Sequence, residues 1–166
     1  MQTRPSPSEA AIRPIVGGRR LVAEAPPLPL TPLLGRDDDV ATVCGLLRSP
    51  GGRLVNLTGP GGVGKTRLAV DVATQLAGEF AAGIAFVSLA AVSQSELVPT
   101  VLARSVGLDD TGPRPVRDQL LDALRQEHLL IVIDNFEHLM DAAAFIPEIS
   151  VNDLRKRDFE TLPFTA

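Results

Sequence analysis

The stretch that decides the fold covers residues 53–66 and reads RLVNLTGPGGVGKT. Its first six letters, residues 53–58, predict a short buried strand, bounded by Gly51-Gly52 before it and by Gly59-Pro60 after it. Its last eight letters, residues 59–66, satisfy the pattern G-x-x-x-x-G-K-[ST] completely. An apolar stripe at Leu68, Val72 and Leu76 then predicts a helix from about residue 65 to residue 80. The stretch therefore predicts a glycine-rich loop between a strand and a helix.

The residue types of this loop suit the binding of a phosphate chain. Glycines adopt backbone angles that are closed to other residues, so successive N–H groups can converge on one anion at a helix N-terminus. Lys65 can reach the β- and γ-phosphates of a nucleotide, and the Thr66 hydroxyl can ligate Mg²⁺. The alternative is a glycine-rich turn that binds nothing. The predicted phosphate-binding residues are Gly59, Pro60, Gly61, Gly62, Val63, Gly64, Lys65, Thr66 and Arg67.

A second apolar run, LLIVI at residues 129–133, ends in Asp134. A strand that is apolar on both faces is typical of the interior of a parallel sheet. Ligands of open α/β sheets bind outside the carboxyl ends of the strands, so Asp134 and the loop are expected to face the same Mg²⁺. Thr66 and Asp134 are the predicted metal ligands, and Lys65 and Asp134 the predicted catalytic pair. The alternative for Asp134 is a cap of a following helix.

The residues after Asp134 bear on hydrolysis. Many ATPases of this type carry an acid at the next position, but here it is Asn135, which can orient water and cannot accept a proton. Glu137 is a substitute candidate, and its alternative is a carboxylate in the first turn of a helix. These residues favour slow turnover, with the nucleotide acting as a switch, over rapid catalysis.

The rest of the chain alternates between helical and strand patterns, which predicts an α/β layered domain. Seven of the 14 prolines fall within the first 32 residues, so residues 1–31 are expected to form a flexible arm, with a possible edge strand at Ile12, Ile15 and Val16. The domain proper is predicted over residues 32–149, and residues 150–166 form a divergent tail. Val40, Val43, Cys44 and Leu47 form the apolar stripe of a first predicted helix. A strand is expected at residues 84–89, followed by a helix that opens at Ser95 and stops at Gly107. Pro115 is expected in the first turn of the next helix.

Composition narrows the function classes. The 166 residues carry a net charge of −4, which argues against binding of nucleic acid or of an anionic membrane by bulk charge. The single cysteine, Cys44, excludes an intrachain disulfide and is expected to be a buried thiol. His128 and His138 lack companions for a metal site and are expected at the surface. Without an export or membrane-spanning signal, the expected compartment is the cytoplasm.

Three separate stretches, LVNLTGPGGVGKTRLAVDVA, FVSLAAV and LLIVIDNFEHL, strongly resemble the nucleotide-binding module of signal-transduction ATPases, the STAND class that includes the NB-ARC domains. The nearest resemblance is to the ATPase modules of bacterial LuxR-type and antibiotic-regulatory transcriptional activators. It implies the three-layer α/β sandwich of the P-loop NTPases, with a parallel sheet, ATP or ADP and Mg²⁺ as ligands, and a switch function. The upstream LLGRDDDV resembles a family element near the adenine, which implies base-side contacts from Leu34, Gly35 and Arg36. The alternative for Arg36 is a solvated charge before a helix.

The resemblance also makes the end of the chain unusual. A further strand, a helical lid and a partner or DNA-binding domain normally follow the Asp134 strand, whereas residues 150–166 match none of them, as in a truncated, frame-shifted or divergent product. The missing strand would normally lie between the loop strand and the Asp134 strand, so the sheet is expected to be incomplete and the chain marginally stable. A cooperative urea transition of full-domain size would contradict that expectation. The arm before residue 32 is too short for a conventional DNA-binding domain, so any such domain belongs to a partner or to a longer relative.

Two rival interpretations remain beside the switch module. The first is a small-molecule kinase or another phosphotransferase with the same loop, although no acceptor-activating acid or arginine-rich lid is recognisable. The second is a truncated remnant that binds nothing. A GTPase is disfavoured because the guanine-specific Asn-Lys-x-Asp element is missing, and a partition-type ATPase because Pro60 occupies the position of its additional lysine.

Overall fold

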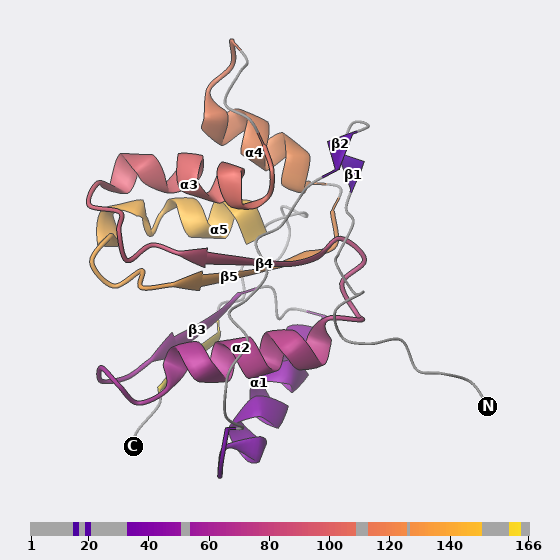
Figure 1. Ribbon diagram of the computed structural model, residues 1–166, viewed down its shortest axis with the longest axis vertical. Coiled ribbons are helices and arrows are strands. Elements are labelled where there is room, and N and C mark those ends of the chain that lie inside the picture. The colour runs from indigo at the N-terminus through magenta and orange to yellow at the C-terminus, as the bar shows by residue number, and fades with distance from the viewer. Residues whose placement is uncertain are drawn as a thin grey trace, which may run out of the picture.

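The computed structural model describes residues 15–16, 19–20, 33–50, 54–108, 113–125, 127–150 and 160–163. Strands and helices alternate along these segments, which confirms the α/β class (Figure 1). In chain order the elements are β1 (Ile15–Val16), β2 (Arg19–Arg20), α1 (Asp37–Arg48), β3 (Val55–Thr58), α2 (Lys65–Leu76), β4 (Gly83–Ser88), the 3₁₀ helix η1 (Ser95–Leu97), α3 (Val98–Ser105), α4 (Val116–Leu124), β5 (Leu129–Asp134), the 3₁₀ helix η2 (Met140–Ala142), α5 (Phe145–Ser150) and β6 (Glu160–Pro163).

The strand that carries Asp134 pairs in parallel with the strand before it in the chain. The register of β4 and β5 runs from Gly83 opposite Leu129 to Ser88 opposite Asp134. Leu130 packs against one apolar cluster, and Leu129, Ile131 and Ile133 pack against another. Because successive side chains of a strand point to opposite faces, this alternation explains why β5 is apolar on both faces. The strand is only half-buried, however, since β4 is the one described strand beside it.

The strand that leads into the glycine-rich loop is shorter and more exposed than predicted. It covers Val55–Thr58 and is half-buried, with Asn56 exposed. Its described partner is β6, which lies parallel to it in a register from Val55 opposite Glu160 to Thr58 opposite Pro163. The segment predicted as a divergent tail therefore contains a strand beside the loop strand. Among the described strands β3 does not pair with β5, as expected for an incomplete sheet.

Helices cover both sides of the β4–β5 pair (Figure 1). Helices α3, α4 and α5 lie on one side, where α3 contacts β4, and α2 lies on the other side against β5, with α1 packed on α2 and β3. Two apolar clusters fill these layers. The loop-side core consists of Val40, Val43, Cys44, Leu68, Val72 and Leu76. The sheet-side core consists of Ala85, Val87, Leu89, Val92, Val98, Leu102, Ala103, Val106, Leu120, Leu124, Leu139, Ala142 and Phe145.

Most helix boundaries follow the sequence pattern, with three corrections. Helix α2 ends at Leu76 and not near residue 80, because a turn from Leu76 to Glu79 replaces the helical bonds there. The helix predicted from Ser95 begins as the 3₁₀ turn η1, and Pro115 caps α4 from outside its first turn. The stop at Gly107 is confirmed, since its φ is 76° and its N–H donates to the carbonyl of Arg104.

The proline-rich arm lies largely outside the described residues, and so does Ile12 of the possible edge strand. Ile15 and Val16 do form a strand, but its described partner is β2, in an antiparallel pair. Within the segments that the structure describes, no helix is long and apolar enough to cross a membrane.

Candidate phosphate-binding site

The glycine-rich loop joins the carboxyl end of β3 to the first turn of α2, as predicted. Gly64 caps α2 with φ of 92°, and Gly62 has φ of 79°. These angles lie in the left-handed region that side chains with a Cβ rarely adopt, although a Cβ at either position would meet no atom within 4 Å. Backbone conformation, and not a lack of space, therefore explains the glycines at these two positions.

The Lys65 ammonium folds back over the loop that precedes it. Its Nζ atom donates to the carbonyl oxygens of Gly59, at 2.9 Å, and Pro60, at 3.0 Å. The side chain is half-buried, and the loop residues Gly59 and Pro60 are exposed. The loop therefore holds a cation beside its exposed first residues.

The two predicted metal ligands are in direct contact. The Thr66 hydroxyl of α2 donates to Oδ1 of Asp134, at the end of β5, over 2.8 Å. Because the N–H of Leu89, just after β4, donates to the Asp134 carbonyl at 3.0 Å, the end of β5 is also fixed to its neighbour. Sixty-eight residues separate Thr66 from Asp134, so the tertiary fold alone brings them together.

The residues that follow Asp134 form a bend and a turn, and not the start of a helix. Asn135 has φ of 59°, a left-handed conformation that asparagine tolerates better than most residues. Glu137 is exposed in this turn. The two alternatives, Asp134 as the cap of a following helix and Glu137 in a first helical turn, therefore do not describe this segment. The short 3₁₀ helix η2 begins only at Met140.

Both histidines are exposed, as predicted. The His128 ring stacks on Phe80 with a centroid distance of 4.7 Å. His138 lies within 2.7 Å of the Val92 carbonyl through Nε2, and so links the turn after β5 to the loop after β4. Neither ring takes part in a group of three or more His, Cys, Asp or Glu side chains that could hold a metal, within the described part of the chain.

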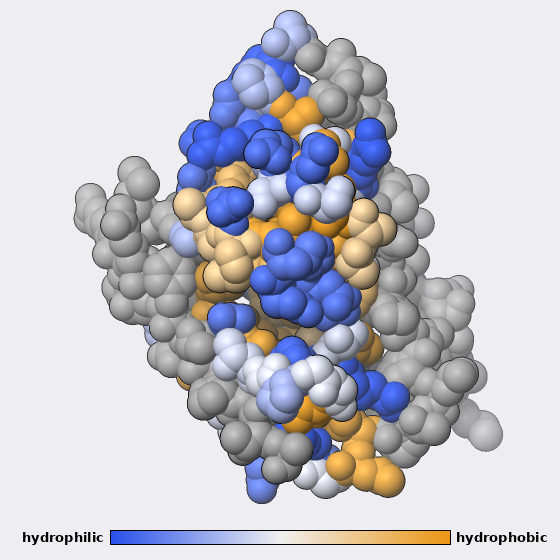
Figure 2. All heavy atoms as spheres, turned by 90° about the vertical axis from the view of Figure 1, so that its left-hand side faces the viewer, coloured by the Kyte–Doolittle hydropathy of each residue, from blue (hydrophilic) through white to orange (hydrophobic). Residues whose placement is uncertain are grey.

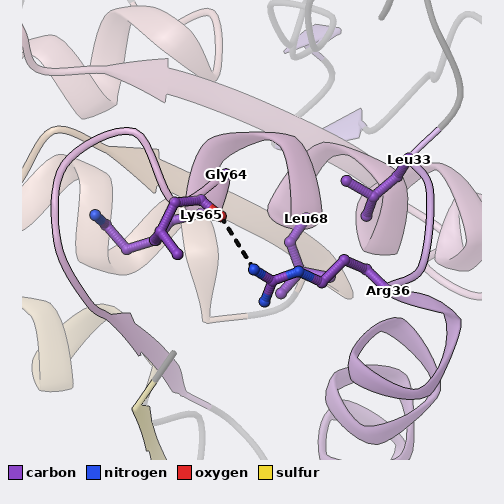
Figure 3. A pocket seen from close by; sticks show the side chains of 6 residues that line it. Leu33, Arg36, Gly64, Lys65 and Leu68 are labelled. Atoms are coloured by element: carbon purple, nitrogen blue, oxygen red, sulfur yellow. Dashed lines mark hydrogen bonds between the residues drawn. The ribbon is translucent and has the colours of Figure 1, made fainter. Parts of the chain in front are cut away.

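The residues expected on the adenine side divide into two groups. The Leu34 side chain is 83% exposed and points into solvent. Arg36 is half-buried beside the loop, which disagrees with a fully solvated charge, and Gly35 precedes it with φ of 70°. A small pocket beside the end of the loop is lined by Leu33, Arg36, Val63, Gly64, Lys65 and Leu68, with the Lys65 ammonium pointing away from Arg36 (Figure 3).

Two residues of this pocket were not among the predicted site residues. Leu68 carried a signal, because it belongs to the apolar stripe of α2, but that stripe indicates packing and not a pocket. Leu33 carried none, since its neighbour Leu34 has the same side chain and is exposed. Only the packing of Leu33 against the loop-side core separates the two.

The donor set at the sheet edge suits a hard cation beside a phosphate chain. Thr66 and Asp134 supply oxygen atoms, and Mg²⁺ is commonly bound by one or two protein oxygens together with substrate phosphates and water. The loops after β3, β4 and β5 open on the left of Figure 1, and Figure 2 shows that hydrophilic residues gather across the middle of this face between apolar flanks. The residues present therefore fit a bound Mg²⁺–nucleotide.

A model of the protein family described as "AAA ATPase domain" matches residues 32–146. The chain belongs to this family. The match places the glycine-rich loop in a P-loop ATPase domain, and it contains every predicted site residue, from Leu34 to Glu137. No solved structure matches this AAA ATPase domain.

Relatives of this AAA ATPase domain occur in mycobacteria. Two proteins named "Putative HTH-type transcriptional regulator", one from Mycobacterium bovis and one from Mycobacterium tuberculosis, are each 47% identical over 92 residues, which cover 55% of this chain and 10% of the relative. An uncharacterized protein of Mycobacterium tuberculosis is 37% identical over 117 residues, which cover 70% of this chain and 29% of the relative. The matched part is thus about a tenth of the named regulators.

Proposed function

We propose that this chain is the ATP–Mg²⁺-binding switch module of a bacterial signalling or transcription-regulatory ATPase of the STAND class, with slow or no hydrolysis. One observation carries the proposal. The Thr66 hydroxyl, which follows the loop lysine, lies 2.8 Å from the carboxylate of Asp134 on a separate strand. A glycine-rich turn without a ligand would need no such pairing of a loop hydroxyl with a distant carboxylate.

Each part of the site has a role in this proposal. The N–H groups at the start of α2 bind the phosphate oxygens, and the helix dipole favours the negative charge. The Lys65 ammonium exchanges the carbonyls of Gly59 and Pro60 for the β- and γ-phosphates. Thr66 and Asp134 hold Mg²⁺, which when bound neutralises charge on the phosphate oxygens. Gly35, Arg36 and the neighbouring pocket lie toward the base.

Slow hydrolysis follows from the residues beyond Asp134. Asn135 orients a water molecule through its amide but cannot take the proton of that water. Glu137 is the next acid and is exposed in the turn after β5. A site that binds ATP tightly and releases phosphate slowly holds its bound state long enough to signal, which suits a regulator.

The longer relatives suggest what the switch controls. Two of them are named as HTH-type regulators, and this chain matches about a tenth of their length. We infer that the nucleotide state is passed to a DNA-binding domain present in such longer proteins. The net charge of −4 supports the view that this chain does not itself bind nucleic acid.

Calorimetric titration of the chain with ATP and ADP, with and without Mg²⁺, tests the proposal together with a phosphate-release assay. We expect that Mg²⁺ strengthens the binding of ATP and that phosphate is released far more slowly than bound nucleotide exchanges with free nucleotide. Lys65→Ala should lower the affinity for ATP by about 100-fold or more. Arg125→Ala is the matched control, because it removes an exposed cation that pairs with Asp122 at 3.0 Å on α4. Absence of binding by the wild type would refute the proposal, and release that requires a second substrate would indicate a phosphotransferase.

A further inference from the structure

The Arg36 guanidinium contacts both the glycine-rich loop and helix α1. Its Nη2 atom donates to the Val63 carbonyl at 3.5 Å, and its Nη1 atom donates to Oδ2 of Asp39 at 3.1 Å. Asp39 lies in the first turn of α1, three residues after Arg36. The planar guanidinium can satisfy two acceptors in fixed directions, which an ammonium group cannot do in the same way. Arg36 therefore links the loop to the start of α1.

The residues before and after Arg36 keep its backbone close to the loop. Leu33 and Val63 both pack against the loop-side core, so the segment before Arg36 and the end of the loop share one apolar anchor. The Arg36 carbonyl accepts the N–H of Val40 at 3.0 Å and so fixes the start of α1. The side chain is 26% exposed, which shields its contacts from water in part. The link is thus part of the packed structure.

Two cations hold opposite ends of the loop. Lys65 binds the carbonyls of Gly59 and Pro60 at its start, whereas Arg36 binds the Val63 carbonyl near its end. In Figure 3 the Lys65 side chain points into the turn of the loop and Arg36 approaches from the side of α1. Arg36 therefore contacts the loop backbone at Val63, away from the carbonyls that Lys65 binds.

The contact with Val63 determines which way a peptide group faces. The peptide from Val63 to Gly64 is trans, so its C=O and its N–H point in opposite directions. When the guanidinium holds the carbonyl on the side of α1, the Gly64 N–H must face away from α1. Gly64 has φ of 92° and no side chain to resist rotation, so this peptide needs an external contact to keep one orientation.

We propose that Arg36 is a positioning residue that locks the Val63–Gly64 peptide, so that the Gly64 N–H stays directed at the bound phosphate chain. Asp39 orients the guanidinium. This inference rests on the proposed nucleotide binding and adds to it a role for Arg36 that does not depend on the base. It also connects α1 to the loop, because this helix begins at Asp37, directly after the residue that contacts the Val63 carbonyl.

Affinities for ATP and for inorganic triphosphate, measured on the full chain by calorimetry, test this inference. We expect Arg36→Ala to weaken both ligands by the same factor, about tenfold, as for the loss of one charge-assisted hydrogen bond. Arg36→Lys should not restore affinity, since one ammonium cannot hold the carbonyl and Asp39 together. Asp39→Asn should lose less, about threefold, and should add nothing to Arg36→Ala, because both act through one contact.

A second readout needs no ligand. The amide ¹H–¹⁵N signal of Gly64 in the nucleotide-free chain should shift or broaden in Arg36→Ala and remain in place in the control Arg48→Ala. Arg48 is the arginine at the other end of α1, where it pairs with Glu79 away from the loop.

Four results separate the two proposals. If the wild type binds neither ligand, the proposed function and this inference both fail before any variant is made. If Arg36→Ala binds both ligands like the wild type and its Gly64 signal does not move, the function stands and the inference is overturned. A loss confined to ATP makes Arg36 a base contact and also overturns it. An equal loss for both ligands with a moved Gly64 signal supports it.

Discussion

The two halves of the molecule that flank the site differ in how deeply their strands are buried. The loop half consists of α1, β3 and α2 around the loop-side core, and the sheet half consists of β4, β5 and α3 to α5 around the sheet-side core. Five of the six residues of β4 are buried, whereas no residue of β3 is, and its Asn56 is exposed. Between the halves lies a cavity that residues of both line, among them Leu54, Phe80, Leu130 and Ile146.

The candidate site residues come from both halves. Lys65 and Thr66 belong to the less buried half, and Asp134 belongs to the more buried half. Local opening in proteins concentrates where apolar contacts are few, so the loop half is expected to open first. A ligand that bridges Thr66 and Asp134 would hold the halves together, which is a physical route from nucleotide binding to a change in the structure.

The largest expected effect is on folding and tests the difference in burial directly. Leu102 of α3 is fully buried in the sheet-side core, whereas Leu57 of β3 is half-buried. Leu102→Ala should therefore lower the free energy of unfolding by about 2–5 kcal/mol, and Leu57→Ala by about 1–2 kcal/mol. Urea titrations of both variants measure this. Equal losses would show that the two halves are equally well packed.

Cys44 provides a probe of opening in the loop half, because it is the only cysteine and is 1% exposed. Burial raises the pKa of its thiol above the ordinary value, so the folded state protects it both sterically and electronically. ATP–Mg²⁺ at 100 times its dissociation constant should slow labelling by a thiol reagent by about 100-fold, if opening breaks the site. Lys65→Ala should abolish the slowing. Labelling at the same rate with and without nucleotide would mean that the loop half opens without disturbing the site.

Asp134→Asn tests the bridge between the halves. The amide keeps an oxygen that can accept from Thr66, but it removes the negative charge that a divalent cation requires. The roughly tenfold gain in ATP affinity that we expect from Mg²⁺, a gain equivalent to about 1.4 kcal/mol, should disappear, while binding without Mg²⁺ remains. Calorimetry measures both. Asp141→Asn, an exposed acid of η2, is the control and should keep the gain. If Mg²⁺ still raises the ATP affinity of Asp134→Asn, the Asp134 carboxylate is not a ligand of the metal.

The smallest effect is expected at the rim of the loop half. Arg48 of α1 donates to both carboxylate oxygens of Glu79, at 3.0 and 3.1 Å from Nε, and this bond lowers the pKa of Glu79 below its ordinary value of 4.5. Because the pKa of Glu79 is lower in the folded state than in the unfolded state, the ion pair stabilises the folded state at pH values above the unfolded pKa. This stabilisation is lost as the pH falls through the folded pKa. Arg48→Ala should cost little at pH 7, as exposed pairs do, and nothing in strong acid. Thermal unfolding at both pH values checks this, and a constant difference would contradict it.

Local signals in the sequence were sufficient for much of the fold. The stripe of Val40, Val43 and Cys44 gave the first helix with its buried face, and Gly107 ended α3, because periodicity and positive φ are properties of a few neighbouring residues. The loop was placed correctly for the same reason. Boundaries that depend on packing were less accurate, as the end of α2 at Leu76 shows.

Other features depend on residues that are distant in the chain. The half-burial of β3 follows from which strands lie beside it, and its described partner β6 comes from a segment with no pattern that indicated a strand. The contact between Arg36 and Val63 spans 27 residues, and the difference between Leu33 and Leu34 depends on one apolar cluster. No local rule contains this information.

By itself, the sequence determined the glycine-rich loop, the strand that ends in Asp134 and the alternation of strands and helices, because glycine conformation and apolar periodicity are properties of short stretches of sequence. The tertiary structure alone decided that Thr66 meets Asp134, that Arg36 holds the loop through Val63, and that the loop strand is less buried than β4. Those outcomes depend on how layers pack, and packing joins side chains that sequence separation leaves unrelated.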